Sequence, residues 1–180
     1  RLVRCSPKAG LGTRPRPHHH KKETEIMIEE IGRQRQCGAC SLLFVASDPQ
    51  KCPSCGVLGD PRDFPTLYAK EIANQNDDFR KSLAGFVTDL SGSIVCTQAV
   101  SALDTATRIQ LISQVAFFSD FSDDNDPNAE REFGSIDLNS EKYFWKIDYY
   151  SDVSVKFGSE EPWNPKATYR VLTILHSHEY

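Results

Sequence analysis

Four cysteines in the N-terminal third of the chain have the spacing of metal ligands. Cys37, Cys40, Cys52 and Cys55 form two Cys-x-x-Cys pairs with eleven residues between the pairs. Two residues between thiolates let a tight turn direct both sulfurs at one ion, and two such turns complete a tetrahedron. Because four thiolates leave no position for a water molecule, we expect a structural Zn²⁺ site. Iron in a rubredoxin-like site and a redox pair or disulfide are the alternatives.

The residues around these cysteines predict a small zinc ribbon, which we place at residues 27–58. Between the pairs, "SLLFVAS" is typical of a strand and "DPQK" of a turn. Gly38 and Gly56 suit the two cysteine turns, because glycine tolerates positive φ. So short a segment buries little apolar surface, and metal binding should therefore supply much of its stability. Residues 59–67, which contain two prolines and a glycine, indicate a linker.

Charge is distributed unevenly along the 180 residues. Residues 37–180 carry 12 basic and 21 acidic side chains, a net charge of −9 (12 − 21). The preceding segment is basic, and we interpret residues 1–26 as a translated leader or disordered arm before Met27. No apolar run approaches the roughly 18 residues that a membrane span needs, and no signal-peptide core is present. A cytoplasmic protein that does not contact membranes is the expectation.

Helical periodicity begins soon after the linker. Apolar spacing predicts a helix from Tyr68 to near Gly85, with Thr66 as its N-cap. The β-branched run that follows predicts a strand at Ile94–Val100. Cys96 within that strand is expected to be a buried small hydrophobe and not a reactive thiol.

The rest of the chain predicts one more helix and three strands. Ser101 and Asp104 have capping-box spacing, and a helix should run from there to about Phe118. "FGSIDL" and "KYFWKIDYY" indicate a hairpin, and residues 168–176 a last strand. Alternation places four apolar or aromatic side chains of the second hairpin strand on one face: Tyr143, Trp145, Ile147 and Tyr149. We therefore predict an α+β fold, with two helices packed on one face of a mostly antiparallel sheet of about four strands.

Three groups of polar residues in this second part could form sites. A ligand face on the open side of the sheet would contain Lys146, Asp148, Tyr150 and Arg170. Cross-strand charge pairing is the alternative explanation of that group. An acidic loop could hold a second cation, Mg²⁺ or Ca²⁺, or form a solvated turn; its carboxylates are Asp120, Asp123, Asp124 and Asp126. His176 and His178 could form a metal pair or lie on the surface near the end of the chain.

Several ordered motifs carry a resemblance to a known family. They are "FSDDNDP", "EFGSIDL", "FWKIDYY", "GSEEPWNP" and "TYRVLTIL". Residues 68–180 resemble the bacterial family catalogued as domain of unknown function 3768, which is often found in mobile genetic regions. The resemblance implies one α+β domain at residues 68–180 and no established activity. The chain departs from the family pattern at Arg131, where relatives often carry histidine.

Three functions are compatible with these features. The first is a binding module for a protein or nucleic acid, with Arg33 and Arg35 beside the ribbon as phosphate contacts and a role as a mobile-element accessory factor. The second is a metal-dependent enzyme that uses the acidic loop, Asp120–Asp126. The third is an acidic phosphate mimic that inhibits a host factor. Because no nucleophile and base with known spacing are present, we favour the binding module.

Overall fold

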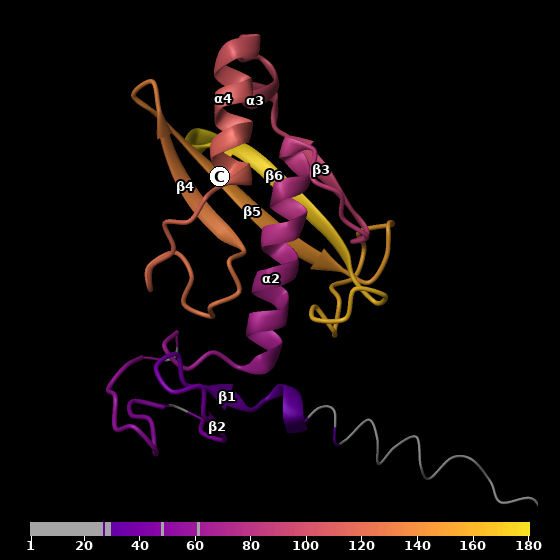
Figure 1. Cartoon of the computed structure of the whole chain (residues 1–180). Helices are drawn as coiled ribbons and strands as arrows, with labels where there is room; N and C mark the ends of the chain where they lie inside the picture. The colour runs from indigo at the N-terminus through magenta and orange to yellow at the C-terminus, as the bar shows by residue number, and fades with distance from the viewer. Residues whose placement is uncertain (1–26, 28–29, 48, 61) are drawn as a thin grey trace, which may run out of the picture.

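The chain forms a small two-stranded ribbon followed by a helix-covered sheet (Figure 1). The computed structural model describes residue 27 and residues 30–47, 49–60 and 62–180, and the predicted leader lies outside them. The ribbon pairs β1 with β2 in antiparallel register; their bounds are Arg35–Gln36 and Leu43–Phe44. The larger elements of the second part are α2 Leu67–Lys81, β3 Gly92–Cys96, α3 Gln98–Ser101, α4 Thr105–Ala116, β4 Phe133–Leu138, β5 Glu141–Tyr150 and β6 Tyr169–His176. Two short 3-10 helices, η1 Ser82–Ala84 and η2 Ser177–Glu179, follow α2 and β6.

The four-stranded sheet has the order β3-β6-β5-β4 and is mixed. The β4–β5 and β5–β6 pairings are antiparallel, whereas β3 runs parallel to β6. Helices α2 and α4 both cover the same face of this sheet (Figure 1). The predicted α+β class is therefore confirmed, with β3 as the strand that departs from antiparallel pairing. Within the described residues, no helix combines the length and apolar character that a membrane crossing requires.

Helix α2 begins and ends as predicted. The Thr66 hydroxyl accepts a hydrogen bond from the N–H of Ala69 at 3.0 Å, as an N-cap does. At the other end η1 continues the helix, and the chain turns at Gly85, whose φ of +87° is left-handed. The buried stripe of α2 includes Ile72 and Phe79. The helix therefore rests on the sheet along the face that its periodicity predicts.

The segment after β3 differs from the prediction in two respects. The predicted strand Ile94–Val100 is too long, since β3 ends at Cys96 and α3 follows. The N-cap of α4 is Asp104 and not Ser101. One Asp104 carboxylate oxygen accepts from two backbone N–H groups of the first turn, at 3.0 and 3.1 Å. A carboxylate satisfies two otherwise unpaired donors, which explains why α4 starts there.

The β4–β5 hairpin is confirmed and places Trp145 in the core. Its two-residue turn, Asn139-Ser140, has positive φ at both positions (54° and 68°), as a type I′ turn requires. Trp145 is fully buried on the helix-covered face. Gly134 lies opposite it, where a Cβ atom would stand 2.5 Å from the indole nitrogen. The buried cluster around Trp145 contains Phe79, Val100, Leu111, Val115, Ile136, Leu138, Tyr143, Ile147, Leu172 and Ile174.

Candidate metal centre and its junction with the sheet

The sulfur atoms of the four ribbon cysteines converge in space. All four lie within 4.8 Å of one another. The Cys37 and Cys55 sulfurs are 3.8 Å apart, and those of Cys40 and Cys52 are 3.6 Å apart. A tetrahedron with Zn–S bonds of about 2.3 Å has edges of about 3.8 Å. The quartet therefore has the dimensions of a closed four-thiolate site, and its cysteines are free of disulfides.

The two cysteine turns repeat the same backbone pattern. The N–H of Ser41 donates to the Cys37 carbonyl at 2.9 Å, and the N–H of Gly56 donates to the Cys52 carbonyl at 3.1 Å. Ser41 and Gly56 stand at equivalent positions and have φ of +60° and +73°. The predicted role of Gly56 is confirmed, whereas Ser41, and not Gly38, takes the left-handed position in the first turn. In the second turn the backbone N–H of Cys55 stabilises the Cys52 thiolate and lowers the pKa of that thiol to about 6.

The segment expected to be a linker is integrated into the ribbon. Phe64 is fully buried and packs with Cys37 and Cys52. Its ring meets Phe44 edge to face, with the centroids 5.7 Å apart. Backbone hydrogen bonds join Gln36 to Pro65 at 2.9 Å, directly before α2 begins. The cysteine-bearing ribbon is thus connected to α2 by a segment that packs on the ribbon and hydrogen-bonds to it.

Arg35 holds the ribbon together instead of facing solvent as a phosphate contact. Its guanidinium donates to the carbonyls of Ala46 and Phe64, both at 2.9 Å, and of Ser47 at 3.2 Å. These bonds connect β1 to the residues that follow β2 and to the segment around Phe64 that precedes α2. Arg35 therefore has a structural role that its position beside the cysteines does not reveal.

The carboxylates of the acidic loop do not converge on a second cation site. Among the described residues, the cysteine quartet is the one cluster whose metal-ligating atoms are close enough to share an ion. Asp120, Asp123 and Asp124 are exposed, and Asp123 forms an ion pair with Arg62 at 3.2 Å. Asp126 is instead buried, and its carboxylate accepts from the backbone N–H of Arg131 at 2.8 Å. The contacts of Asp123 and Asp126 indicate that these two carboxylates stabilise the folded loop.

The predicted ligand face is divided between the two sides of the sheet. Lys146 and Asp148 lie together on the open side, with their charged atoms 2.8 Å apart, and Tyr150 follows on the same side of β5. Arg170 is opposite Tyr149 in the register and therefore points to the helix-covered side, where it is fully buried. The structure thus separates Arg170 from the other three residues.

The histidines near the end of the chain are engaged by neighbouring residues. The rings of His176 and His178 are 4.2 Å apart. The Nε2 atom of His176 is 3.0 Å from the Glu141 carboxylate, and its Nδ1 accepts from the backbone N–H of His178 at 3.3 Å. Cys96 is half-buried against the core, and burial raises the pKa of its thiol. That location agrees with a hydrophobic role for the cysteine.

Sequence reasoning did not predict that Arg80 and Arg170 are buried, nor that Asn76 on α2 is a partner of Arg170. Arg80 donates to the carbonyls of Val115 and Phe118, both at 3.0 Å, and lies over the Trp145 ring at 4.7 Å. Arg170 donates to Asn76 at 3.3 Å. Asn76 and Arg80 are four residues apart on the same stripe as the apolar core residues of α2. Polar residues at core-facing positions of the helical pattern are the signal that could have found them.

Acidic side chains gather beside this network at the end of the acidic loop. The carbonyl of Glu130 accepts from the Asn76 amide at 2.8 Å. Burial raises the pKa of the Glu130 carboxyl to about 7, and the nearby charges of Glu132 and Asp126 add to the effect. The same desolvation raises the pKa of Glu132. The folded chain therefore binds more protons here than the unfolded chain does at weakly acidic pH.

Stability should fall as the pH rises from about 5 to about 8, because the folded state favours protonated Glu130. Glu130→Gln should be more stable than the wild type at pH 8, by up to about 2 kcal/mol once partial solvent access is allowed for. At pH 4 the two proteins should be equally stable. Urea unfolding at each pH measures this difference, with the exposed Glu160→Gln as the control. An E130Q gain that does not change with pH would contradict the assignment.

Comparison with known families identifies the second part of the chain. Residues 96–179 match the model of the family described as protein of unknown function (DUF3768). This segment is similar to the DUF3768 family. The resemblance of the sequence motifs is thereby confirmed, although the match begins at Cys96 and not at Tyr68, so α2 and the ribbon lie outside it. The matched segment contains α3, α4, β4, β5, β6 and η2. No curated protein and no solved structure matches the chain.

Proposed function

We propose that the protein is a zinc-ribbon binding protein that acts through contact with another protein. The exposed apolar surface of the ribbon carries this proposal. Val45 is 81% exposed and Leu58 is 75% exposed, and both are large apolar side chains in a segment held by the cysteine site. Leu43 and Val57 are exposed beside them in sequence. Apolar side chains presented by a rigid element are typical of protein contacts.

Charge favours a protein partner over a nucleic acid. A divalent ion with four thiolates carries two net negative charges, and the acidic residues after the ribbon add more. Arg35, one of the two arginines expected to contact phosphate, uses its guanidinium within the ribbon. Nucleic-acid binding depends on cationic side chains that reach phosphates. A repulsive field with few such side chains therefore supports the protein-binding alternative.

Structural zinc also supports binding over catalysis. A quartet of thiolates occupies all four positions of Zn²⁺, so the ion would hold the ribbon and not activate water. A metal-dependent enzyme would need the carboxylates of the acidic loop, and two of the four are already engaged: Asp123 by Arg62 and Asp126 by the backbone N–H of Arg131. The role of the metal in this proposal is to keep the apolar side chains in place.

Affinity capture with the zinc-loaded full chain tests the proposal. Val45→Asp and Leu58→Asp should each reduce capture of a partner protein from source-cell lysate by at least about tenfold, because a charge is buried in an apolar contact. Val87→Asp is the matched control, since Val87 is 95% exposed outside the ribbon. Equal capture by all variants would refute the ribbon as the binding surface. A salt-sensitive shift of labelled DNA by the same protein would favour nucleic acid instead.

A further inference from the structure

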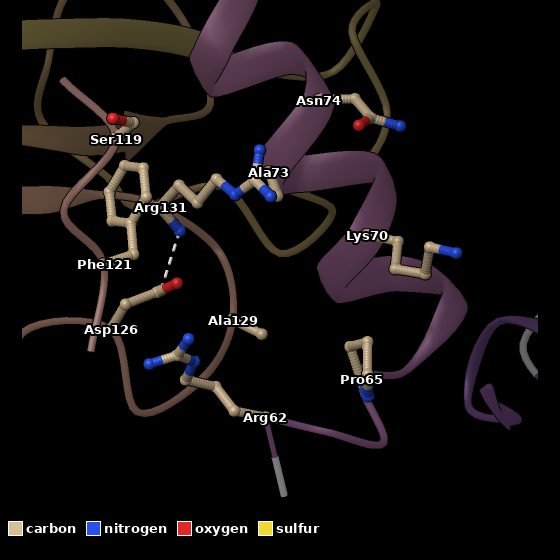
Figure 2. Close-up of a pocket in the computed structure, with 10 residues that line it drawn as sticks. All are labelled: Arg62, Pro65, Lys70, Ala73, Asn74, Ser119, Phe121, Asp126, Ala129 and Arg131. Carbon is tan, nitrogen blue, oxygen red and sulfur yellow. Dashed lines mark hydrogen bonds between the residues drawn. The ribbon is translucent and has the colours of Figure 1, made fainter. Parts of the chain in front are cut away.

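A hollow of about 300 Å³ lies where the ribbon meets the sheet (Figure 2). One wall is the paired segment from Arg62 to Pro65, a second is the first half of α2, and a third is the loop from Ser119 to Arg131. We call this hollow the junction pocket. Ligand cavities begin at about this size. A neighbouring hollow of about 220 Å³ shares Arg131 with it and extends toward Arg80.

Three of the ten residues that line the junction pocket carry cationic side chains. Arg62 and Arg131 extend in opposite directions, and Lys70 lies at the rim with its ammonium directed away from both (Figure 2). That ammonium donates to the side-chain oxygen of Gln36. Asp126 is the acidic side chain among the lining residues. Its carboxylate accepts from the backbone N–H of Arg131 and is nearly enclosed by the loop. The positive groups therefore outnumber the negative ones in the pocket.

Both arginines are held in position with hydrogen-bond donors to spare. The Nη1 atom of Arg62 contacts Asp123 at 3.2 Å, and the Nη1 atom of Arg131 contacts Asp77. A guanidinium has five N–H donors, and the described residues supply no further acceptor to either side chain. Asp77 and Asp123 orient these groups and partly neutralise them. A ligand here would meet oriented N–H donors.

An unusual backbone conformation around Arg131 holds this residue at the pocket. Ala129 and Arg131 both line the pocket, and both have left-handed φ, 58° and 55°. This conformation is unfavourable for residues with a side chain and persists where neighbouring contacts enforce it. Two bonds to Asp126 enforce it here, from the N–H of Ala129 at 3.1 Å and of Arg131 at 2.8 Å. The turn thus fixes the base of the Arg131 side chain.

We propose that the junction pocket binds a small phosphate-bearing molecule, which Arg62 and Arg131 contact through their guanidinium groups. Guanidinium groups match the geometry of phosphate oxygens, two at a time. The N–H donors that Asp77 and Asp123 leave unused on the two guanidinium groups suit the oxygens of a phosphate. The pocket uses none of the exposed apolar side chains of the ribbon, so this site is independent of the proposed partner surface.

Titration of the zinc-loaded full chain with inorganic phosphate at low ionic strength tests the site, with calorimetry as the readout. The wild type should bind one phosphate saturably. Arg131→Gln and Arg62→Gln should each weaken binding by about tenfold, which is the usual effect of removing one charge-assisted contact. Arg131→Lys should lie between the wild type and R131Q, because lysine keeps the charge but loses the planar edge.

A matched control distinguishes phosphate binding in the junction pocket from non-specific attraction of phosphate by charged groups elsewhere on the protein. Lys142→Gln removes an exposed lysine that pairs with Asp137 on the open side of the sheet, and it should change phosphate affinity by less than about twofold. Each variant is first checked by thermal melting, and R62Q provides a second test should R131Q fail to fold. Absence of saturable binding in the wild type would overturn the proposal. The proposal would also fail if K142Q and R62Q weakened phosphate binding equally.

Discussion

Cys52→Ser is expected to abolish metal binding and unfold the ribbon while the sheet remains folded. Structural zinc contributes about 10–16 kcal/mol of apparent binding free energy to small domains of this kind. The described ribbon core otherwise consists of Cys37, Cys52 and Phe64, with Leu42 and Phe44 against it, which is too little apolar burial to hold the segment alone. Zinc content by elemental analysis and hydrogen exchange of the amides of Cys37 and Gly56 measure the two effects.

Cys96→Ser is the control for loss of a thiol, because Cys96 lies in β3 outside the quartet. It should retain full zinc content and ribbon protection. Chelation of the wild type should reproduce the exchange pattern of C52S and leave the amides of β5 protected. If C52S kept one equivalent of zinc, or if chelation unfolded β5 together with the ribbon, the assignment of a separate metal-held unit would be wrong.

Trp145→Ala should produce the largest loss of stability in the sheet, about 3–5 kcal/mol. Trp145 is fully buried, and its ring meets Phe118 at 5.4 Å and Phe121 at 6.3 Å between centroids. The Arg80 guanidinium lies over the same ring, so truncation removes a cation–π contact as well as apolar burial. A cavity would remain next to a buried charge. Urea unfolding followed by circular dichroism measures the change.

Phe86→Ala is the matched truncation of an exposed aromatic residue, since Phe86 is 57% exposed after η1. It should cost less than about 1 kcal/mol, because little area is removed from the interior. A loss below about 1.5 kcal/mol for W145A, or equal losses for the two variants, would show that the centre of the core lies elsewhere.

Local patterns predicted those features that depend on neighbours in the sequence. The Cys-x-x-Cys spacing brings two sulfurs to one ion because the turn spans so few residues. The N-cap of α2 at Thr66 needs contacts only three residues away, at Ala69. Alternation along β5 separates Trp145 from Lys146 whichever strands lie beside it. The β4–β5 hairpin follows for the same reason, although its turn is shorter than the pattern predicted, because Glu141 already belongs to β5.

Features that join distant segments were not predictable from these patterns. Parallel pairing of β3 with β6 depends on how the chain returns after the hairpin, and alternation in a strand is the same in either direction. Register placed Arg170 on the covered side, and the packing of Phe64 made the expected linker part of the ribbon. Each of these depends on a long-range contact and leaves no periodic trace in the sequence.

The sequence by itself therefore determined the cysteine quartet that could hold a metal ion, most of the helices and strands, and the similarity of residues 96–179 to their family. Only the tertiary structure decided that Arg62 and Arg131, 69 positions apart (131 − 62), line one pocket. The physical reason is that a turn, a cap or an alternating strand is set by side chains a few residues apart. A pocket between a ribbon and a sheet exists only once both have folded and packed together.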